Sequence, residues 1–231
     1  MSWMFPRRSG IRAPEPREWL LGALYFPVYL YFLNLAILTY FPALGFPLTE
    51  PRNYFFANLL YMTVNFAVML LIFRRTLWQS LREFEGKMLL SVLIGFGMCY
   101  GASLVLTTAY TVLDIMPENY NQEAVNSLLG GYPLAMTLCT VVLAPLARKC
   151  LPAAYALSMF LFAGMHVFQF LGSMTAANTI LCLSLYLPAS FSLCWVYQKT
   201  GNIWASIFLH MFINFQSVLA SLLRSLMQAF L

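Results

Sequence analysis

The sequence predicts an all-α membrane protein, a polytopic bundle of about seven transmembrane helices. Of its 231 residues, 61% are hydrophobic and only 9% are charged, whereas a soluble domain carries about 25% charged residues. A soluble chain of this length has too much surface for its volume to bury so apolar a composition. The apolar runs are about twenty residues long, which is the length of a spanning helix and not of a barrel strand.

Seven apolar segments are each long enough to cross the roughly 30 Å hydrocarbon core as a helix. The first begins at Trp19, exceeds the h-region of a signal peptide and lacks a small-residue cleavage site. The fourth begins loosely at Gly130-Gly131, and Pro145 and Pro152 flank the basic link between the fourth and the fifth. The expected spans are Trp19–Phe41, Tyr54–Phe73, Met88–Leu113, Leu128–Leu146, Leu151–Leu171, Ala176–Tyr197 and Ile203–Leu223.

The distribution of charge predicts the orientation of the chain. With a cytoplasmic N-terminus, eleven of the thirteen basic residues fall on the inner side, and only Arg52 and Arg224 fall outside. This is the positive-inside pattern, so we expect the N-terminus in the cytoplasm and, after seven spans, the C-terminus outside. The net charge of +5 therefore reflects topology, and we expect no nucleic-acid partner. The inner basic residues are Arg7, Arg8, Arg12, Arg17, Arg74, Arg75, Arg82, Lys87, Arg148, Lys149 and Lys199.

The five cysteines do not indicate a metal or redox site. None of them has C-x-x-C spacing, and all lie in or beside apolar segments. We interpret them as small core residues. They are Cys99, Cys139, Cys150, Cys182 and Cys194.

Both histidines of the chain lie inside predicted spans, where polar groups are costly and usually face the bundle interior or a wet cavity. His210 and Asn214 are four residues apart and share one helix face, as do Phe162 and His166. On spacing alone, these side chains fit interhelical hydrogen bonds worth about 0.6–2 kcal/mol each. They are too few to establish a metal site, and they form no catalytic set without a base.

Three features of the second half of the chain resemble motifs of one known family. They are Phe162-x-x-x-His166, the run from Trp195 through His210-x-x-x-Asn214, and Val141-Val-Leu-Ala-Pro-Leu146. Together they resemble the CPBP family of intramembrane proteases, the type II CAAX prenyl endopeptidase group. The resemblance covers about residues 117–220, a little under half of the chain.

The resemblance implies a membrane endopeptidase, whose relatives cleave near the C-terminus of prenylated proteins, process bacterial peptides or confer bacteriocin immunity. It implies His166, His210 and Asn214 as catalytic residues, with His and Asn donors stabilising the attacked carbonyl, and Phe162 as a substrate-binding residue. It implies membrane lipids and a membrane-associated peptide or prenylated protein as partners, in a bacterial plasma membrane. A divalent metal is implied only by the metalloprotease label of the family.

On this basis we divide the chain into an N-terminal membrane region, residues 1–116, with three spans and a CPBP-like core, residues 117–231, with four. The N-terminal region has no motif that indicates a family. We expect its helices to pack around the core.

The chain departs from the family at the position of its first motif, Glu-Glu-x-x-x-Arg, whose Glu activates a water molecule. Arg148-Lys149 stands where the paired Glu is expected, and no acidic residue occurs from Ala124 to Leu231. Arg148 lies eighteen residues before His166, where the family has about thirty between the Glu pair and Phe-x-x-x-His. We therefore expect that a Glu-bearing segment was lost near Ala147, and an intact ancestral gene without this segment would contradict that expectation.

No other residue is an evident replacement for the missing base. We interpret Glu118 and Glu123 as solvated loop charges. A histidine, His166 or His210, has suitable chemistry but would need a rearranged mechanism. Two functions remain open: a protease of this family with impaired activity, and a non-catalytic relative that binds a membrane peptide or lipid. A transporter or scaffold has only the polytopic character in its favour.

Overall fold

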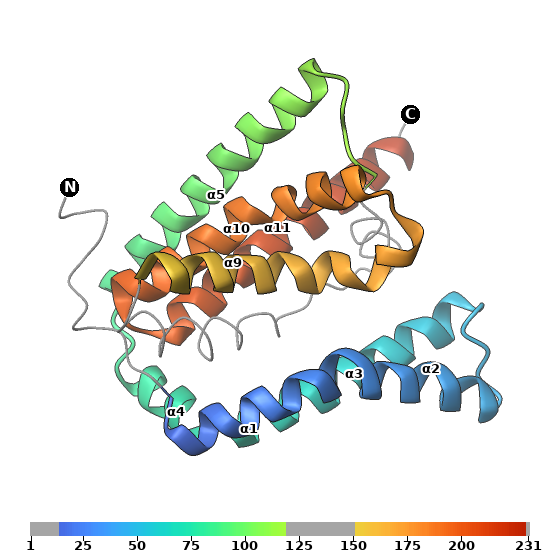
Figure 1. The fold of residues 1–231 in the computed structure, drawn as a ribbon, viewed down its shortest axis with the longest axis horizontal. Coiled ribbons are helices and arrows are strands. Elements are labelled where there is room, and N and C mark those ends of the chain that lie inside the picture. Colours follow the sequence, from blue (N-terminus) through green and yellow to red (C-terminus); the bar gives the residue numbers. More distant parts are fainter. Residues whose placement is uncertain (1–13, 119–150, 230–231) are drawn as a thin grey trace. The chain divides into compact units, whose positions relative to one another are not determined.

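The computed structural model describes residues 14–118 and 151–229, and every regular element in these two ranges is helical (Figure 1). The predicted all-α fold class is thereby confirmed. Helices form over six of the seven predicted spans, and the fourth, Leu128–Leu146, lies outside the described residues. The total of seven spans stays a prediction.

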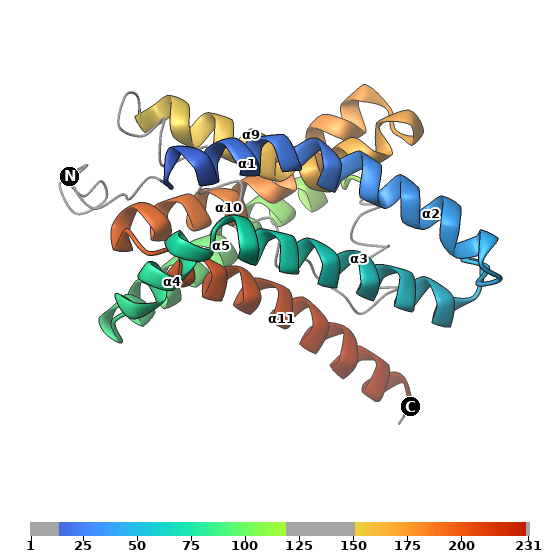
Figure 2. The same cartoon turned by 90° about the horizontal axis from the view of Figure 1, so that it is seen from below.

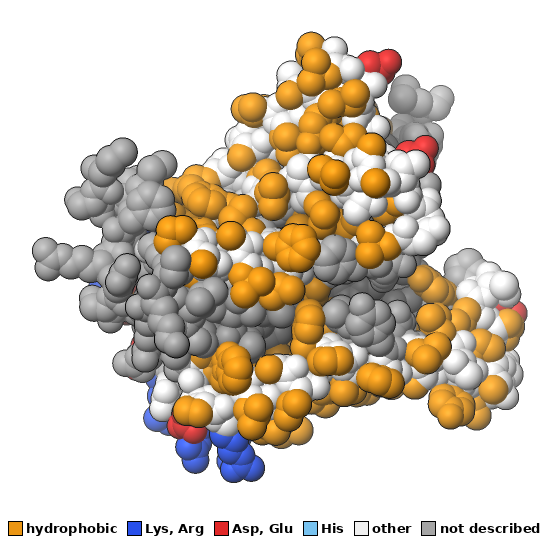
Figure 3. All heavy atoms as spheres, in the orientation of Figure 1, with side chains coloured by type: hydrophobic (Ala, Val, Ile, Leu, Met, Phe, Trp, Pro, Cys, Tyr) orange, Lys and Arg blue, Asp and Glu red, His pale blue; other side chains and the backbone are white. Residues whose placement is uncertain are grey.

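Three of the described helices are long and apolar enough to cross a membrane. They are α3 (Pro51–Ile72), α5 (Lys87–Val112) and α10 (Ala176–Thr200). Large apolar side chains remain exposed along them, for example Leu71 on α3 and Val105 on α5, which are 70% and 71% exposed. In Figure 3, apolar side chains cover the visible helices, whereas charged side chains lie at helix ends. So much exposed apolar surface fits lipid as the surrounding solvent, which confirms an integral membrane protein.

The described residues form two compact units, Pro14–Gln79 and the residues from Ser80 onward. The boundary between them falls inside the short helix α4 (Arg74–Arg82). The third predicted span, α5, lies in the second unit, where it packs against α10 and α11 (Ile203–Ala229). The division expected from the sequence, between residues 116 and 117, separates the N-terminal region from the part that resembles the family. The two compact units do not test that division, so it stays a prediction.

The first predicted span is a helix with a widened turn in its middle. The α-helix α1 (Pro16–Pro27) leads into the π-helix η2 (Val28–Leu33), which is followed by α2 (Asn34–Ala43). Pro27 has no N–H to donate, and its ring crowds the carbonyl one turn earlier, so regular α-helical bonding cannot continue through it. The Tyr61 hydroxyl of α3 donates to the Tyr29 carbonyl within this turn at 2.9 Å, which provides a partner for that group.

A buried asparagine joins α1 and α3 in the N-terminal unit. Asn65 is fully buried, its Oδ1 accepts from the Tyr25 hydroxyl at 2.6 Å, and its Nδ2 donates to the Tyr61 carbonyl at 2.7 Å. Because no water competes for these groups in hydrocarbon, the Tyr25–Asn65 bond holds α1 and α3 together at about 0.6–2 kcal/mol, and the bond within α3 gives the amide donor a partner. They explain why a polar residue is found in an otherwise apolar span.

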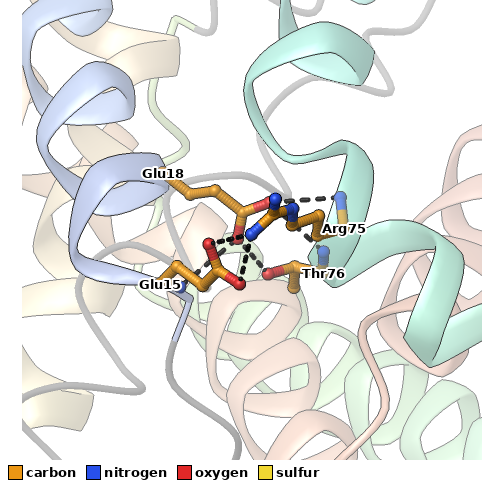
Figure 4. A network of polar contacts seen from close by, with 4 residues as sticks. All are labelled: Glu15, Glu18, Arg75 and Thr76. Carbon is orange, nitrogen blue, oxygen red and sulfur yellow. Dashed lines mark hydrogen bonds and ion pairs between the residues drawn. The ribbon is translucent and has the colours of Figure 1, made fainter.

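Glu18 bonds to the N-terminal ends of two helices at once (Figure 4). In α1 it completes a capping box with Glu15: the Glu18 carboxylate accepts a hydrogen bond from the Glu15 backbone N–H. Its carboxylate also accepts from the backbone N–H groups of Arg75 and Thr76, at 3.2 and 3.3 Å, and from the Thr76 hydroxyl. These N–H groups are in the first turn of α4, where they have no partner within the helix. A negative charge there also stabilises the positive end of the helix dipole.

The second unit is built around α10, which packs against α9 (Leu151–Val167), α5 and α11 (Figures 1 and 2). The contact between α5 and its neighbours is close at Gly95, where a methyl group would lie 2.5 Å from Val196 Cγ2 and 3.0 Å from Leu209 Cδ2. Absence of a side chain at Gly95 therefore lets α5 approach both α10 and α11, as small residues do in membrane bundles.

A tight turn joins α10 to α11 and fixes the start of α11. Gly201 ends α10 in the left-handed region with φ of 66°, which glycine adopts without steric cost. Asn202 then accepts the Trp204 N–H at 2.9 Å and donates through Nδ2 to the Ser80 carbonyl at 2.6 Å. Asn202 is 2% exposed, so these bonds are shielded from competing partners. The turn therefore sets the position of α11, the helix that carries His210.

Replacing Gly95 by Ala tests the close packing of α5. The added methyl overlaps the branched side chains of Val196 and Leu209, so we expect a loss of about 1–3 kcal/mol in the free energy of unfolding. Gly97→Ala is the matched control, because no atom lies within 4 Å of a methyl at that position. Alanine is the better helix former, so the control should be neutral or slightly stabilising. Circular dichroism during unfolding in mixed micelles measures the free energy of unfolding of both variants. Equal changes in this free energy for Gly95→Ala and Gly97→Ala would contradict the close packing at Gly95.

Candidate active site

The structure brings Phe162, His166 and His210 together where α9 and α11 both lie against α10. Phe162 is 1% exposed, and its ring centroid lies 4.8 Å from that of His166 and 5.8 Å from that of His210. The Phe162 and His210 rings meet edge-on at 87°, a favoured geometry for aromatic pairs. Phe162 thus contacts both histidines, which lie 44 residues apart in the sequence.

The two predicted catalytic residues of α11 lie one helical turn apart. His210 is 3% exposed, and Asn214 is half-buried on the same face of the helix. Burial of a polar ring this deep in an apolar helix fits a position facing the interior of the bundle. The roles of His210 and Asn214 in catalysis stay predictions.

The contact of His166 with its own helix fixes which ring nitrogen carries the proton. His166 Nδ1 lies 2.8 Å from the Phe162 carbonyl oxygen, one turn earlier on α9. A carbonyl oxygen accepts hydrogen bonds and cannot donate them, so Nδ1 must carry the proton. In the neutral ring, Nε2 then has the lone pair and accepts a hydrogen bond. In this state Nε2 of His166 is able to accept a hydrogen bond and has no proton to donate to an oxyanion.

Tyr186 of α10 is a member of the cluster that the motifs did not indicate. Its ring stacks on His166 with centroids 4.5 Å apart and planes at 22°. The stack and the Nδ1 hydrogen bond together hold the imidazole in one orientation. No local motif marks Tyr186, because its place depends on how α10 packs beside α9.

A second contact that the sequence motifs did not indicate joins the N-terminal part of α9 to α10. The buried Tyr155 hydroxyl donates to Gln198 Oε1, and the Tyr155 ring lies 5.7 Å from that of Phe191. Tyr155 precedes Phe162 by seven residues, which places both on one face of α9. That spacing could have revealed Tyr155 as a residue facing the bundle interior.

No carboxylate stands near the histidines in the part of the chain that the structure describes. Glu118, interpreted from the sequence as a loop charge, is exposed, and its backbone N–H donates to Asn178 Oδ1 at 3.0 Å. Asn178 precedes Tyr186 by eight residues, about 12 Å along α10. Glu123 and the segment near Ala147 lie outside the described residues.

The described side chains do not provide a metal site. Within residues 14–118 and 151–229, no three His, Cys, Asp or Glu side chains gather in a way that could hold a metal ion. A catalytic zinc takes three protein ligands, and the imidazoles of His166 and His210 are two. We therefore assign no chemical step to a metal.

Two comparisons with known proteins find sequence similarity to membrane peptidases. The family model described as type II CAAX prenyl endopeptidase, Rce1-like, matches residues 131–216. The motifs and the family model agree that this part of the chain is similar to the CPBP family. The chain is thus similar to membrane peptidases of the CAAX type.

The chain is also similar to "Putative membrane peptidase YdiL" of Bacillus subtilis (strain 168). The two are 26% identical over 158 residues, which is 64% of this chain and 64% of that protein. The chain thus spans less than two thirds of the length of that relative. No solved structure matches the chain.

The ¹⁵N spectrum of the histidine rings tests the proton position at His166. The chain has only two histidines, so labelled histidine gives two ring systems, and the His210→Gln variant assigns them. When the His166 ring is neutral, we expect it to carry its proton on Nδ1, because the Phe162 carbonyl accepts a hydrogen bond from that atom. A proton on Nε2 instead would show that this hydrogen bond is not formed.

Proposed function

We propose that the chain descends from membrane endopeptidases of the CPBP type and retains one part of their active site. The retained part is the buried cluster of Phe162, His166 and His210, with Asn214 one turn beyond. The missing part is the carboxylate, because no acidic residue follows Glu123 in the sequence. We propose that the present chain hydrolyses peptide bonds slowly or not at all.

The reason for the low activity is the loss of a general base. Such a base contributes about 10²–10⁴-fold to the rate of hydrolysis. Hydrogen-bond donors such as His210 and Asn214 would still stabilise an oxyanion, and one such donor is worth about 10²–10³-fold. His166 Nε2 could accept a proton from water, but a neutral imidazole acting alone replaces the carboxylate only by a different mechanism.

The second candidate function is binding without cleavage. The observation that favours it is the close aromatic packing around both histidines, which persists in a chain without the Glu pair. The proposed ligand is a membrane-associated peptide or a prenylated protein, held by Phe162 and by hydrogen bonds to the rings. The distribution of basic residues supports a cytoplasmic N-terminus. The resemblance to the family alone supports a bacterial plasma membrane.

Hydrolysis of a farnesylated peptide by the full chain in lipid nanodiscs tests the proposed impairment. We expect cleavage by the wild-type chain to stay close to the background of empty nanodiscs, because the absence of the base alone costs about 10²–10⁴-fold. Met211→Ala is the matched control, since Met211 is the neighbouring residue on α11 and is exposed.

Two results would change the proposal in different ways. Rapid cleavage that His210→Ala abolishes and Met211→Ala leaves intact would show an active peptidase. The proposal of impaired hydrolysis would then be wrong, and the assignment of His210 to the active site would be correct. Rapid cleavage, well above background, that neither variant reduces would exclude His210 from the site.

A further inference from the structure

We propose that α9 and α10 enclose an ordered water molecule, which the hydroxyl groups of Ser158 and Ser190 hold. Both serines are fully buried, at 0% exposed. Among the residues that the structure describes, neither hydroxyl has a hydrogen-bond partner. The water site lies beside the candidate active site, and it stands whether or not the chain hydrolyses peptides.

Other hydroxyl groups of the described helices are satisfied within their own helix. Four threonines each donate to the backbone carbonyl four residues earlier, at 2.7–2.9 Å. Ser158 on α9 and Ser190 on α10 make no such bond, although both lie within helices. A buried hydroxyl without a partner is costly, so these two groups require a hydrogen-bonding ligand. The four threonines are Thr63, Thr111, Thr179 and Thr200.

The positions of the two serines place both hydroxyls at the interface of α9 and α10, which lie side by side (Figures 1 and 2). Ser158 is three residues after Tyr155, whose hydroxyl bonds to α10. Ser190 is four residues after Tyr186, whose ring stacks on His166 of α9. Residues three or four apart share a helix face. Both serines therefore lie along the interface between these two contacts.

A second requirement for a hydrogen bond arises in the same part of α10. Pro188 has no N–H, so the carbonyl of Ser184, four residues earlier, lacks its usual helical donor. In membrane helices that contain proline, hydroxyl groups and ordered water provide partners for such backbone groups. Pro188 is two residues before Ser190, so polar groups that need a partner gather in the middle of α10.

Water is the ligand that fits between the two hydroxyls. Each hydroxyl can donate one hydrogen bond and accept two, so it matches either a hydrogen or a lone pair of water. An internal water needs about two to four polar partners, and Ser158 and Ser190 provide two. Because neither serine has any exposed surface, the site is closed to a larger ligand. Ser158 lies one turn before Phe162, which places the water next to the histidines.

Hydroxyl radicals generated in place by a short X-ray pulse test for this water in the full chain in lipid nanodiscs. The pulse splits water molecules, and each radical oxidises the side chains that it touches, so a buried side chain is labelled only where water lies beside it. Digestion and mass spectrometry measure the oxidation. We expect Phe162 to be oxidised several-fold more than Phe73. Phe73 is the matched reference, because it is a phenylalanine of similar burial, 2% exposed against 1%.

The variant Ser158→Ala/Ser190→Ala should lower the oxidation of Phe162 several-fold, because it removes both partners of the water. Ser192→Ala is the matched control. The Ser192 hydroxyl is also buried and has no partner among the described residues, but Ser192 lies beside α5. This control should leave the oxidation of Phe162 unchanged.

Two results would overturn the proposal. Equal oxidation of Phe162 and Phe73 in the wild-type protein would show that no water lies between α9 and α10, and this result does not depend on the folding of any variant. Oxidation of Phe162 that survives in the double variant, with an unchanged circular dichroism spectrum, would show that the two serines do not hold the water.

Discussion

The C-terminal unit depends on the burial of the second half of α10. From Ser192 to Gln198 every residue of this helix is buried, and a helix buried all round needs neighbours on every side. α9, α5 and α11 provide them. Small residues make the close contacts possible, since Gly95 leaves room for Val196, and the buried Ser158 and Ser190 add little volume.

The geometry of the candidate site follows from this packing. Because α9 and α11 share α10 as a partner, Phe162 reaches His210 across the helix interface. Tyr186 on α10 then stacks against His166, and the Phe162 carbonyl fixes the proton of that ring on Nδ1. These contacts are made by aromatic and imidazole side chains and by the Phe162 carbonyl, and none of them involves a carboxylate. The cluster can therefore persist in a chain without the Glu pair, although a hydrolase of this type needs a base as well as donors.

The helices over six of the seven expected spans were predictable, because the bilayer imposes length and composition on each helix separately. The pair Phe162 and His166 and the pair His210 and Asn214 were predictable from helical spacing, and the motifs suggested that the pairs belong together. Tyr186 was not predictable, since its contact with His166 depends on the packing of two helices. Nor was α4, a helix with three arginines in a region expected to be a loop. The turn at Val28–Leu33 had a local signal in Pro27, whereas the hydrogen bond from the Tyr61 hydroxyl to the Tyr29 carbonyl depends on how α3 packs beside it.

Photo-crosslinking with a farnesylated peptide that carries a diazirine on its prenyl chain tests the central claim most directly, because it locates the binding site independently of cleavage. After irradiation of the protein in nanodiscs and digestion, mass spectrometry identifies the labelled segments. The account predicts label within 151–167 and 203–216, reduced by excess unlabelled peptide and by Phe162→Ala. Label confined to residues 14–79, or label on α9 and α11 that Phe162→Ala does not change, would contradict it.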